Sequence, residues 1–442
     1  MERDVSSGFR MTEKKTGIFR RGITLFLLLI LLIPTGCSSQ KKESKTNTVG
    51  EIVKIPVIFT VNPTTGKKNN KELAEAFNRE YRGKYQVEVE WVMETEEAYR
   101  QNLKRQNVTD ELPAVITDLR LLPSFYQMMI KDDRLENLAP YLEKDGEWRN
   151  MVEPVVMEGC AESESEIYLA PISTAAFSCS GMFWNEELFA QAGIEKFPET
   201  WEEFWDCCER LEARGITPLA LHTEGTAWAP MLIATTELAD SEEGAEFMKQ
   251  LYPESYQNES GIHLAETLER LFQYTTEDAV HSDFDVAYNN FFSGKVAMIP
   301  NGYWMIEQIP EGWENKVRFS PFPGNKMISS PETFGWAVVS SYSEEVKEGA
   351  VEFLKFRTRY NKEEKERLIE SGNASDSQVV NDYIRAFTGN PQIVPNYQVK
   401  WNSIFQEETL GEAIPELIAE KITPEIFTQM ADESIWRFEE EQ

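Results

Sequence analysis

The residue types that most often carry catalysis or bind metals are sparse in this sequence. Among 442 residues only three are histidine, His222, His263 and His281, and none of them belongs to an HExxH pattern. The five cysteines show no CxxC spacing and no Cys/His alternation of the kind that holds zinc. We therefore expect no metal and no cofactor.

Four of the cysteines, Cys160, Cys179, Cys207 and Cys208, lie well inside the sequence. Cys207 and Cys208 are adjacent and cannot easily bridge each other, so the simplest interpretation is four small apolar side chains in a core. A disulfide between Cys160 and Cys179 is an alternative that stays open for a protein outside the cytoplasm.

The fifth cysteine, Cys37, follows a segment that has the features of an export signal. Nine apolar residues at 25–33 come after the basic pair Arg20 and Arg21. A helix that spans a membrane needs roughly 20 apolar residues, so this run is too short for a permanent anchor. The pattern predicts a signal peptide.

The sequence around Cys37 resembles the lipobox of bacterial lipoproteins, in which the cysteine carries lipid and becomes the new N-terminus. Pro34 stands where that group usually has leucine. We expect residues 1–36 to be a lipoprotein signal peptide and residues 37–51 to be a lipidated, flexible tether. The alternative is a plain secreted protein in which Cys37 is incidental, and Met11 is an alternative start.

The chain is strongly acidic. Removing residues 1–36 takes away six basic and three acidic side chains, which leaves 38 basic and 72 acidic side chains and a net charge of about -34. Nucleic acid and anionic lipid surfaces repel such a chain, and no Lys/Arg-rich stripe with interleaved aromatic residues is present. We expect no nucleic-acid partner. About 400 residues exceed what one core supports, which predicts two domains.

The order of the expected elements indicates an α/β fold. A β-branched run at 52–61, an amphipathic helix at 71–81 and an alternating strand at 86–92 predict a β-α-β start, and another apolar strand is expected at 112–119. Strands that alternate with helices predict a mostly parallel sheet, with a crevice outside the carboxyl ends of its strands.

The middle of the chain carries clear helix signals. Thr200 and Glu203 form a capping-box pattern before a helix that Gly215 ends, and the apolar stripe of this helix is expected to be core. Further elements are expected as a strand at 216–221 and helices at 344–359 and 410–440.

The segment FFSGKVAMIPNGYWMIEQI (291–309) is the most specific in the sequence. Gly294 favours a turn, VAMI is a buried strand, and Asn301-Gly302 is expected to end that strand with a tight turn. Tyr303 and Trp304 then lie at the carboxyl end of the strand, where they are candidates for the wall of a cleft. The alternative is that Trp304 begins a helix and packs inward.

This segment and others, in the same order, resemble the extracellular solute-binding proteins of ABC transporters, in the group that includes maltose-binding protein. The stretch WNEELFAQAGIEKFPETWEEF in 182–221 resembles a segment of that family, and 334–358 resembles its returning strand and helix. The early helix and the strand at 112–119 also match, although Ala114 replaces the usual aspartate. The resemblance covers roughly residues 52–440.

The resemblance implies a type II periplasmic-binding-protein-like fold, with two α/β lobes joined by a hinge and the ligand cleft between them. The chain is expected to cross between the lobes near Pro171 to Ser178, near Ser330 to Trp336 and near Gly372 to Ser377. Lobe one is expected to hold residues 52–175 and 334–373, and lobe two residues 176–333 and 374–442.

The resemblance also implies aromatic rings that stack on a sugar. Trp304, Trp401 and Trp228 fall at or near such positions. The C–H faces of sugars are weakly apolar and their hydroxyls need hydrogen bonds, so rings and polar side chains work as pairs. Trp336 and Trp184 are further candidates, but both lie in apolar strands and alternatively pack in a core.

Polar candidates follow the expected strands. They are Asn62 and Thr64 after the first strand, Asp118 after the third strand, and Glu224 and Thr226 beside the tryptophan at 228. Asn62-Pro63 is alternatively an ordinary turn, and Asp118 an ordinary helix cap.

The family implies a substrate-binding lipoprotein of an ABC importer, which captures a sugar or oligosaccharide by hinge closure and delivers it to the permease. We expect a monomer held by lipid at the outer face of the cytoplasmic membrane. The alternatives are a surface sensor or adhesion lipoprotein on the same scaffold, a binder of another solute, and a secreted glycoside hydrolase, for which the sequence shows no catalytic signature.

Overall fold

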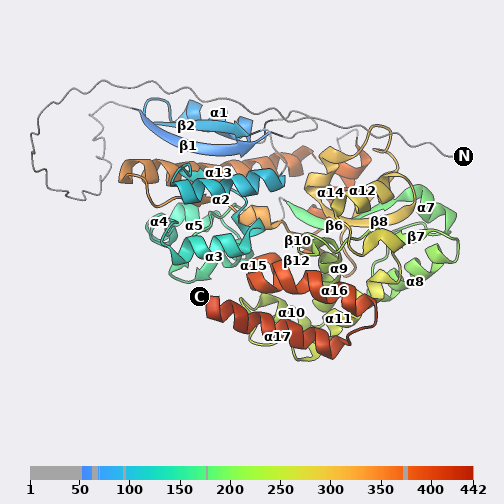
Figure 1. Ribbon diagram of the computed structural model, residues 1–442. Coiled ribbons are helices and arrows are strands. Elements are labelled where there is room, and N and C mark those ends of the chain that lie inside the picture. Colours follow the sequence, from blue (N-terminus) through green and yellow to red (C-terminus); the bar gives the residue numbers. More distant parts are fainter. Residues whose placement is uncertain are drawn as a thin grey trace, which may run out of the picture. The chain divides into compact units, whose positions relative to one another are not determined.

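The structure is a computed structural model that describes residues 52–61, 68, 70–92, 96–175, 178–371 and 377–441 (Figure 1). The expected signal peptide, the tether with Cys37, and the candidates Asn62 and Thr64 lie outside the described residues. Within these ranges the chain forms two larger sheets and a two-stranded hairpin, and each larger sheet has its own hydrophobic core.

The first sheet is built largely from the N-terminal part of the chain. Its strand order is β11-β3-β1-β2, in which β1 pairs with β2 and with β3 in parallel and β11 pairs with β3 antiparallel. The expected β-α-β start is confirmed, but the strand expected at 112–119 is much shorter. The bounds are β1 (Val53–Thr60), α1 (Lys71–Glu80), β2 (Tyr85–Val92), β3 (Val115–Ile116) and β11 (Ala337–Val338).

Short helices and one long helix pack around the first sheet. The long helix α13 packs against β1, and its Phe353 lies 5.1 Å, centroid to centroid, from Phe77 of α1. It extends well beyond the helix expected at 344–359. The bounds are α2 (Glu96–Thr109), η1 (Leu119–Leu121), α3 (Pro123–Lys131), α4 (Ala139–Lys144), α5 (Gly146–Asn150), α6 (Pro154–Cys160), the hairpin of β4 (Ala161–Ser163) and β5 (Glu166–Ile167), and α13 (Glu344–Ser371).

The second sheet is mixed, which differs from the expectation of a mostly parallel sheet. Its order is β12-β10-β6-β8-β7, and β9 also pairs with β6. The strand β6 runs antiparallel to β8, β9 and β10, because the chain enters this sheet at the edge where those strands end. The bounds are β6 (Cys179–Asn185), β7 (Thr217–Leu219), β8 (Val296–Gly302), β9 (Val317–Ser320), β10 (Lys326–Ser329) and β12 (Gln392–Val394).

Helices surround the second sheet, and the C-terminal helices α16 and α17 lie with α10 and α11 in the lower part of Figure 1. The last helix begins at Pro424, as the expected break there predicts. The bounds are α7 (Glu186–Gln191), α8 (Trp201–Glu212), α9 (Trp228–Leu238), α10 (Glu242–Lys249), α11 (Glu259–Phe272), η3 (Glu277–Ala279), α12 (Phe284–Phe292), η4 (Tyr303–Gln308), η5 (Pro331–Phe334), α14 (Gln378–Thr388), α15 (Tyr397–Lys400), η6 (Phe405–Thr409), α16 (Leu410–Ile418) and α17 (Pro424–Glu441).

Helix α8 shows how local sequence fixes an element. The Thr200 side chain accepts a hydrogen bond from the backbone of Glu203, and the Glu203 carboxylate accepts one from the backbone of Thr200, so the capping box is confirmed. Gly215 adopts a left-handed conformation just beyond the helix. The apolar stripe is buried, as expected: Trp201, Phe204, Trp205, Cys208 and Leu211.

One sequence expectation is wrong and one open alternative is excluded, whereas the expected burial of the four cysteines within the sequence is confirmed. Asn301 and Gly302 do not form a turn, because both belong to β8, where Gly302 pairs with Ser180 of β6. Cys160 and Cys179 do not form a disulfide, because both are free and lie in the cores of different sheets.

A search of the described residues for a helix that is long and apolar enough to cross a membrane finds none.

Candidate functional site

The candidate site lies where four strands of the second sheet end. Strand β7 is parallel to β8, and β10 is parallel to β12. Because β6 is antiparallel to both β8 and β10, the carboxyl ends of β7, β8, β10 and β12 lie at the same edge of the sheet. The segments that leave this edge are 220–227, 303–308, 330–336 and 395–401. Five of the candidate aromatic residues lie on these segments or begin the next helix: Trp228, Tyr303, Trp304, Trp336 and Trp401.

Trp304 lies half-buried in η4, two residues after Gly302, the last residue of β8. Its indole rests on the backbone of Gly302, because a Cβ atom built on this glycine would come within 1.9 Å of the ring. No other aromatic ring among the described residues pairs with it. Trp304 does begin a short helix, but its ring keeps an accessible surface at the strand ends.

Tyr303 has a different environment from its neighbour. Its ring lies 4.6 Å from that of Tyr383, and it packs on the core that includes Met305 and Phe319. Burial raises the pKa of the Tyr303 phenol, so the hydroxyl stays protonated at neutral pH. Tyr303 therefore anchors the segment, and Trp304 is left as the aromatic surface.

The segment before α9 is strained. Gly225, Thr226 and Ala227 all adopt positive φ angles, of 67°, 65° and 50°. A β-branched residue such as threonine rarely adopts this conformation, so the surrounding contacts must hold it. The Tyr397 hydroxyl donates to the Thr226 carbonyl (2.8 Å), and the Gln398 amide donates to the Thr226 hydroxyl (3.2 Å). Such strain is typical of ligand-binding segments.

Trp228 follows directly as the first residue of α9. The indole is half-buried and lies 5.1 Å from the His222 ring and 5.4 Å from the Phe284 ring. Glu224, on the same segment, is exposed, and its backbone N–H donates to the Ser282 carbonyl at 3.0 Å. Trp228, Glu224 and Thr226 therefore lie together, as the sequence order requires.

The buried His222 contacts both the backbone of Glu224 and the ring of Trp228. It is 1% exposed, and its Nδ1 atom lies 3.0 Å from the Glu224 carbonyl oxygen, so Nδ1 carries the hydrogen of the neutral ring. Burial lowers its pKa to about 4 against a weaker opposing effect of Asp283, and the ring is neutral at physiological pH. Nε2 is then a buried acceptor, and the structure gives it no partner.

Three further buried polar atoms at this edge lack a hydrogen-bond partner. They are the Asn301 amide nitrogen, at the end of β8, the Thr333 hydroxyl, in η5, and the Trp401 indole nitrogen. Buried polar groups are normally paired, so unpaired ones mark places for a ligand or water. Sequence reasoning missed His222 and Thr333 as site residues and took Asn301 for a turn residue; only their place after a strand could have pointed to them.

On the first sheet, Asp118 follows β3 in a left-handed conformation (φ 65°) and is half-buried. It occupies the cap position of η1 without a capping hydrogen bond from its side chain. The next residue, Leu119, donates its backbone N–H to the Gly335 carbonyl (3.3 Å), which lies on the segment arriving from β10. Asp118 thus lies where the chain passes from one sheet to the other.

The remaining tryptophan candidates lie in cores. Trp401 is 2% exposed and has four aromatic rings within 6 Å of its own, those of Phe247, Tyr256, Tyr397 and Phe405. A stacking surface for a ligand is not accessible there, which corrects the expectation for Trp401.

Trp336 packs between Phe59 and Phe353 of the first core, and Trp184 packs against Phe189 in the second. Both positions match the packing alternative stated for them.

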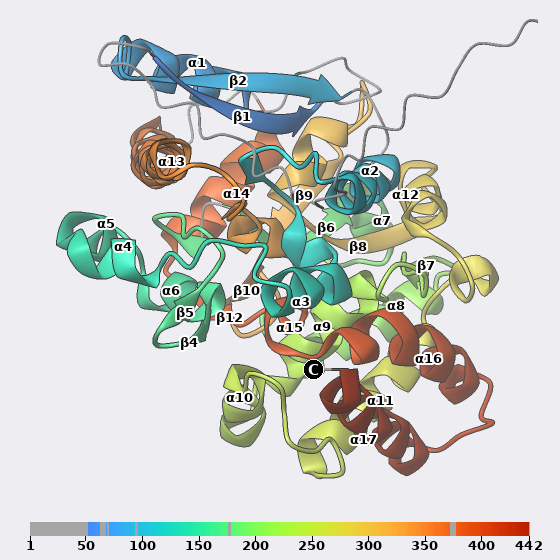
Figure 2. The same cartoon turned by 60° about the vertical axis from the view of Figure 1, so that its left-hand side comes forward.

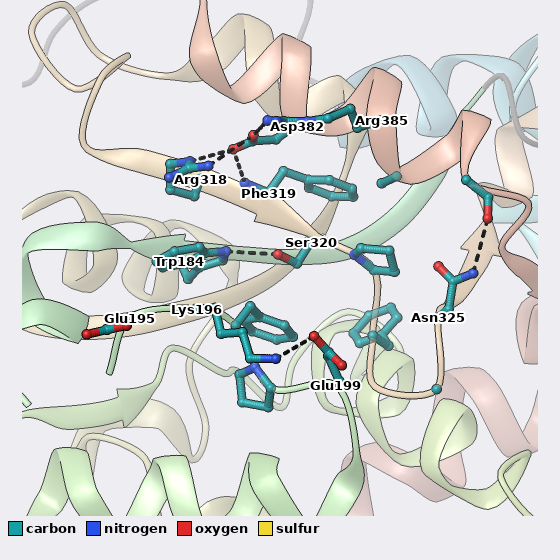
Figure 3. A pocket seen from close by; sticks show the side chains of 17 residues that line it. Trp184, Glu195, Lys196, Glu199, Arg318, Phe319, Ser320, Asn325, Asp382 and Arg385 are labelled. Atoms are coloured by element: carbon teal, nitrogen blue, oxygen red, sulfur yellow. Dashed lines mark hydrogen bonds and ion pairs between the residues drawn. The ribbon is translucent and has the colours of Figure 1, made fainter. Parts of the chain in front are cut away.

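A cavity of about 680 Å³ lies on the second sheet's side of the molecule, between the α7–α8 loop, the β9–β10 turn and α14 (Figure 3). Most of its charged residues are in ion pairs. Asp382 accepts hydrogen bonds from Arg318 (2.6 Å) and from Gln378 (3.0 Å), and it also pairs with Arg385. Because this network is satisfied within the protein, we place the site at the strand ends instead.

No group of three or more metal-binding side chains that could hold a metal ion is present in the part of the chain that the structure describes.

Two sheets with separate cores, connected where strand ends of both meet, define a two-lobed α/β binding protein. The chain belongs to the bacterial extracellular solute-binding proteins, whose family model matches residues 64–359. We call the part around the first sheet the first lobe and the part around the second sheet the second lobe.

Similar proteins extend this result. A multiple sugar-binding protein of Streptococcus mutans is 29% identical over 177 residues, which cover 36% of this chain and 39% of that protein. The chain therefore aligns with well under half the length of this curated relative.

Solved structures share the fold. A chitin oligosaccharide binding protein superposes with a TM-score of 0.63 at 18% identity, over 88% of this chain and 99% of that chain. A Streptococcus pneumoniae solute-binding protein in complex with the blood group A-trisaccharide superposes with a TM-score of 0.62 at 18% identity, over 87% and 99%.

Proposed function

We propose that this protein is the substrate-binding component of an ABC importer and that it captures a sugar or oligosaccharide outside the cytoplasm. The observation that carries the proposal is the pair of half-buried indoles, Trp304 and Trp228, at one edge of the second sheet. Buried polar atoms without a protein partner lie on the same segments, at His222 and Asn301. Aromatic faces beside hydrogen-bonding groups are what a sugar requires.

The family and the relatives support the choice of ligand. The similar proteins include a multiple sugar-binding protein and structures named for chitin oligosaccharide and for a blood group trisaccharide. In our proposal Glu224 and Thr226 supply hydrogen bonds beside the indole of Trp228, and Asp118 contributes from the first lobe. Asn62 and Thr64 remain proposed on the family resemblance alone.

Capture takes place by closure of the two lobes on the ligand, without chemical change. We propose lobe boundaries of 52–175 with 334–373, and of 176–333 with 374–442; the separate cores of the two sheets support this division. Ligand contacts that exist only in the closed form shift an existing equilibrium between open and closed forms.

We further propose that the protein is a monomeric lipoprotein, anchored through Cys37 at the outer face of the cytoplasmic membrane, and that it delivers its ligand to permease subunits. The family is extracellular, and this agrees with an exported, tethered chain. Replacement of Cys37 by alanine should release the protein from the membrane fraction, and continued retention would contradict the lipid anchor.

A thermal-shift screen of residues 38–442 tests the ligand class. The panel holds mono- and oligosaccharides, amino acids and polyamines, because a ligand that binds only the folded protein adds ~2.7 kcal/mol at one hundred times its dissociation constant. We expect a raised melting temperature with one group of sugars. A shift with another solute alone would keep the fold and overturn the sugar assignment, and hydrolysis of the sugar would favour a glycoside hydrolase.

A further inference from the structure

A tyrosine of the second lobe inserts into a polar pocket of the first lobe. Tyr252, between α10 and α11, donates its hydroxyl hydrogen to Oε2 of Glu162 on β4 at 2.7 Å. The Gln127 amide on α3 donates to the oxygen of the same hydroxyl. Figure 2 shows α6 and the β4–β5 hairpin directly above α10, so the two partners come from facing parts of the lobes.

The acceptor, Glu162, is also held by other side chains of the first lobe. The other carboxylate oxygen of Glu162, Oε1, accepts hydrogen bonds from Arg120 (3.0 Å) and from the Tyr126 hydroxyl (2.9 Å). The side chains of Arg120 and Glu162 are only 4% and 12% exposed. All of these groups belong to the first lobe, and a buried, ionised acceptor makes a stronger hydrogen bond than a neutral, solvated one.

The donor is also held in place. Tyr252 has a φ of 53°, which is unusual for a bulky residue, and its backbone N–H donates to the Lys400 carbonyl at 2.8 Å. Its ring lies 5.1 Å from that of Phe438 on the last helix. Burial and the charge of Glu162 both raise the pKa of Tyr252, so the phenol keeps the hydrogen that it donates.

Other residues near Tyr252 also make contacts between the two lobes. The Lys400 ammonium, 5% exposed, pairs with Glu158 of α6 at 2.9 Å. The Ser124 hydroxyl donates to Glu407 at 2.8 Å, and Val399 packs in the core of the first lobe. Tyr252 is the member of this set whose hydroxyl enters the opposite lobe and reaches a buried charge.

We propose that Tyr252 is a closure latch, a positioning residue that raises ligand affinity by stabilising the closed form without touching the ligand. The inference rests on the proposed function, because it assumes that ligand is captured by closure of the lobes. A contact that exists only in the closed form adds to the apparent affinity for any ligand that binds that form.

The test compares Tyr252→Phe with Tyr81→Phe. The Tyr81 hydroxyl donates to Glu352 at 3.1 Å, which is the same kind of bond, but both partners lie within the first lobe. Both variants remove one hydroxyl and keep the ring. For the sugar identified by thermal shift, we expect Tyr252→Phe to bind about tenfold more weakly, through faster dissociation, and Tyr81→Phe to bind within about twofold of the parent protein.

Small-angle scattering without ligand separates this inference from the proposed function. Tyr252→Phe should have a larger radius of gyration than the parent and Tyr81→Phe should not, and this result does not depend on which ligand binds. If both variants match the parent in radius and in affinity, the latch is overturned while the sugar-binding function stands. If the parent binds no sugar but Tyr252→Phe still expands, the sugar assignment fails, while the stabilisation of the closed form by Tyr252 stands.

A second variant guards against misfolding of the first. Gln127→Ala removes the other partner of the Tyr252 hydroxyl from the opposite lobe and leaves the second lobe unaltered. It should weaken binding in the same direction by about two- to threefold. Unchanged affinity and unchanged radius in this variant would also contradict the latch.

Discussion

The surroundings of Trp304 and Trp401 differ completely, although the sequence suggested the same role for both. The Trp304 ring lies on the backbone of a glycine at a strand end and stays half-exposed. The Trp401 ring is enclosed by four aromatic rings and is 2% exposed. The comparison teaches that the exposure of a tryptophan near a strand end depends on its neighbours, because Gly302 lets the Trp304 ring lie on the backbone whereas four rings enclose Trp401.

The largest expected effect is on the stability of the core around Trp401. Trp401→Ala removes a ring with four aromatic neighbours and should lower the free energy of unfolding by about 3–5 kcal/mol. Urea denaturation followed by circular dichroism measures this change. Trp436, which is 66% exposed on α17, provides the control, because Trp436→Ala should change stability by less than about 0.5 kcal/mol. A small loss at Trp401 would break the comparison.

Replacing Trp304 should affect binding and not stability. Trp304→Ala is expected to weaken binding of the sugar by about 2 kcal/mol, roughly thirtyfold, because an aromatic stacking surface is lost. Isothermal titration calorimetry gives the affinity, and the melting temperature without ligand should stay close to that of the parent. A collapse of the melting temperature would mean that Trp304 is a core residue like Trp401.

Lowering the pH should lower the free energy of unfolding, because the buried His222 beside Trp228 resists protonation in the folded protein. The His222 pKa is lowered to about 4 in the folded state from an ordinary value of 6.5, so between these two values the unfolded chain binds the additional proton. Stability is therefore highest well above pH 6.5, and it falls by about 1.4 kcal/mol per pH unit only in the window between the two pKa values.

The pH effect is measured by denaturation at pH 6.5 and pH 5.5. His222→Gln should lose about 1 kcal/mol less than the parent over this interval, whatever its stability at pH 6.5, because the unfolded histidine is already half-protonated at its ordinary pKa of 6.5. His263→Gln, at an exposed position on α11, is the control and should keep the slope of the parent. Identical slopes for all three proteins would contradict the buried neutral state of His222.

The smallest effect tests the glycine beneath Trp304. A Cβ atom in Gly302→Ala would meet the indole at 1.9 Å, so the half-exposed ring must move outward. We expect binding to weaken by about 1 kcal/mol, roughly fivefold, with the tryptophan still present. Intrinsic fluorescence and calorimetry report the displaced ring and the affinity. Unchanged binding would show that the position of the ring on Gly302 does not matter.

Much of the fold could be predicted because its signals are local. The period of apolar residues in 71–81 and the capping pattern of Thr200 and Glu203 act within a few residues, and α1 and α8 formed as predicted. The mixed second sheet could not be predicted in this way. The direction of β6 depends on the edge at which the chain enters that sheet, and this is a property of the whole lobe.

The candidate site was also predictable only where its signals are local. The order of strand, Asn301-Gly302 and Trp304 brought an aromatic residue to a strand end, and Trp228 followed from its own segment. Burial of Trp401 was beyond the reach of the sequence, because its neighbours Phe247 and Tyr256 come from about 150 residues earlier in the chain. His222 gave no signal of its own, since its role comes from contacts with Glu224 and Trp228.

The sequence by itself determined the acidic composition, the helices with strong caps, the α/β class and the strand end that presents Trp304. Only the tertiary structure decided which tryptophans are exposed, that Thr226 is strained, and that Tyr252 meets Glu162. The physical reason is distance along the chain. Periodicity and capping act within one element, whereas burial, strain and contacts between lobes depend on residues that only folding brings together, as Tyr252 and Glu162 show across 90 positions.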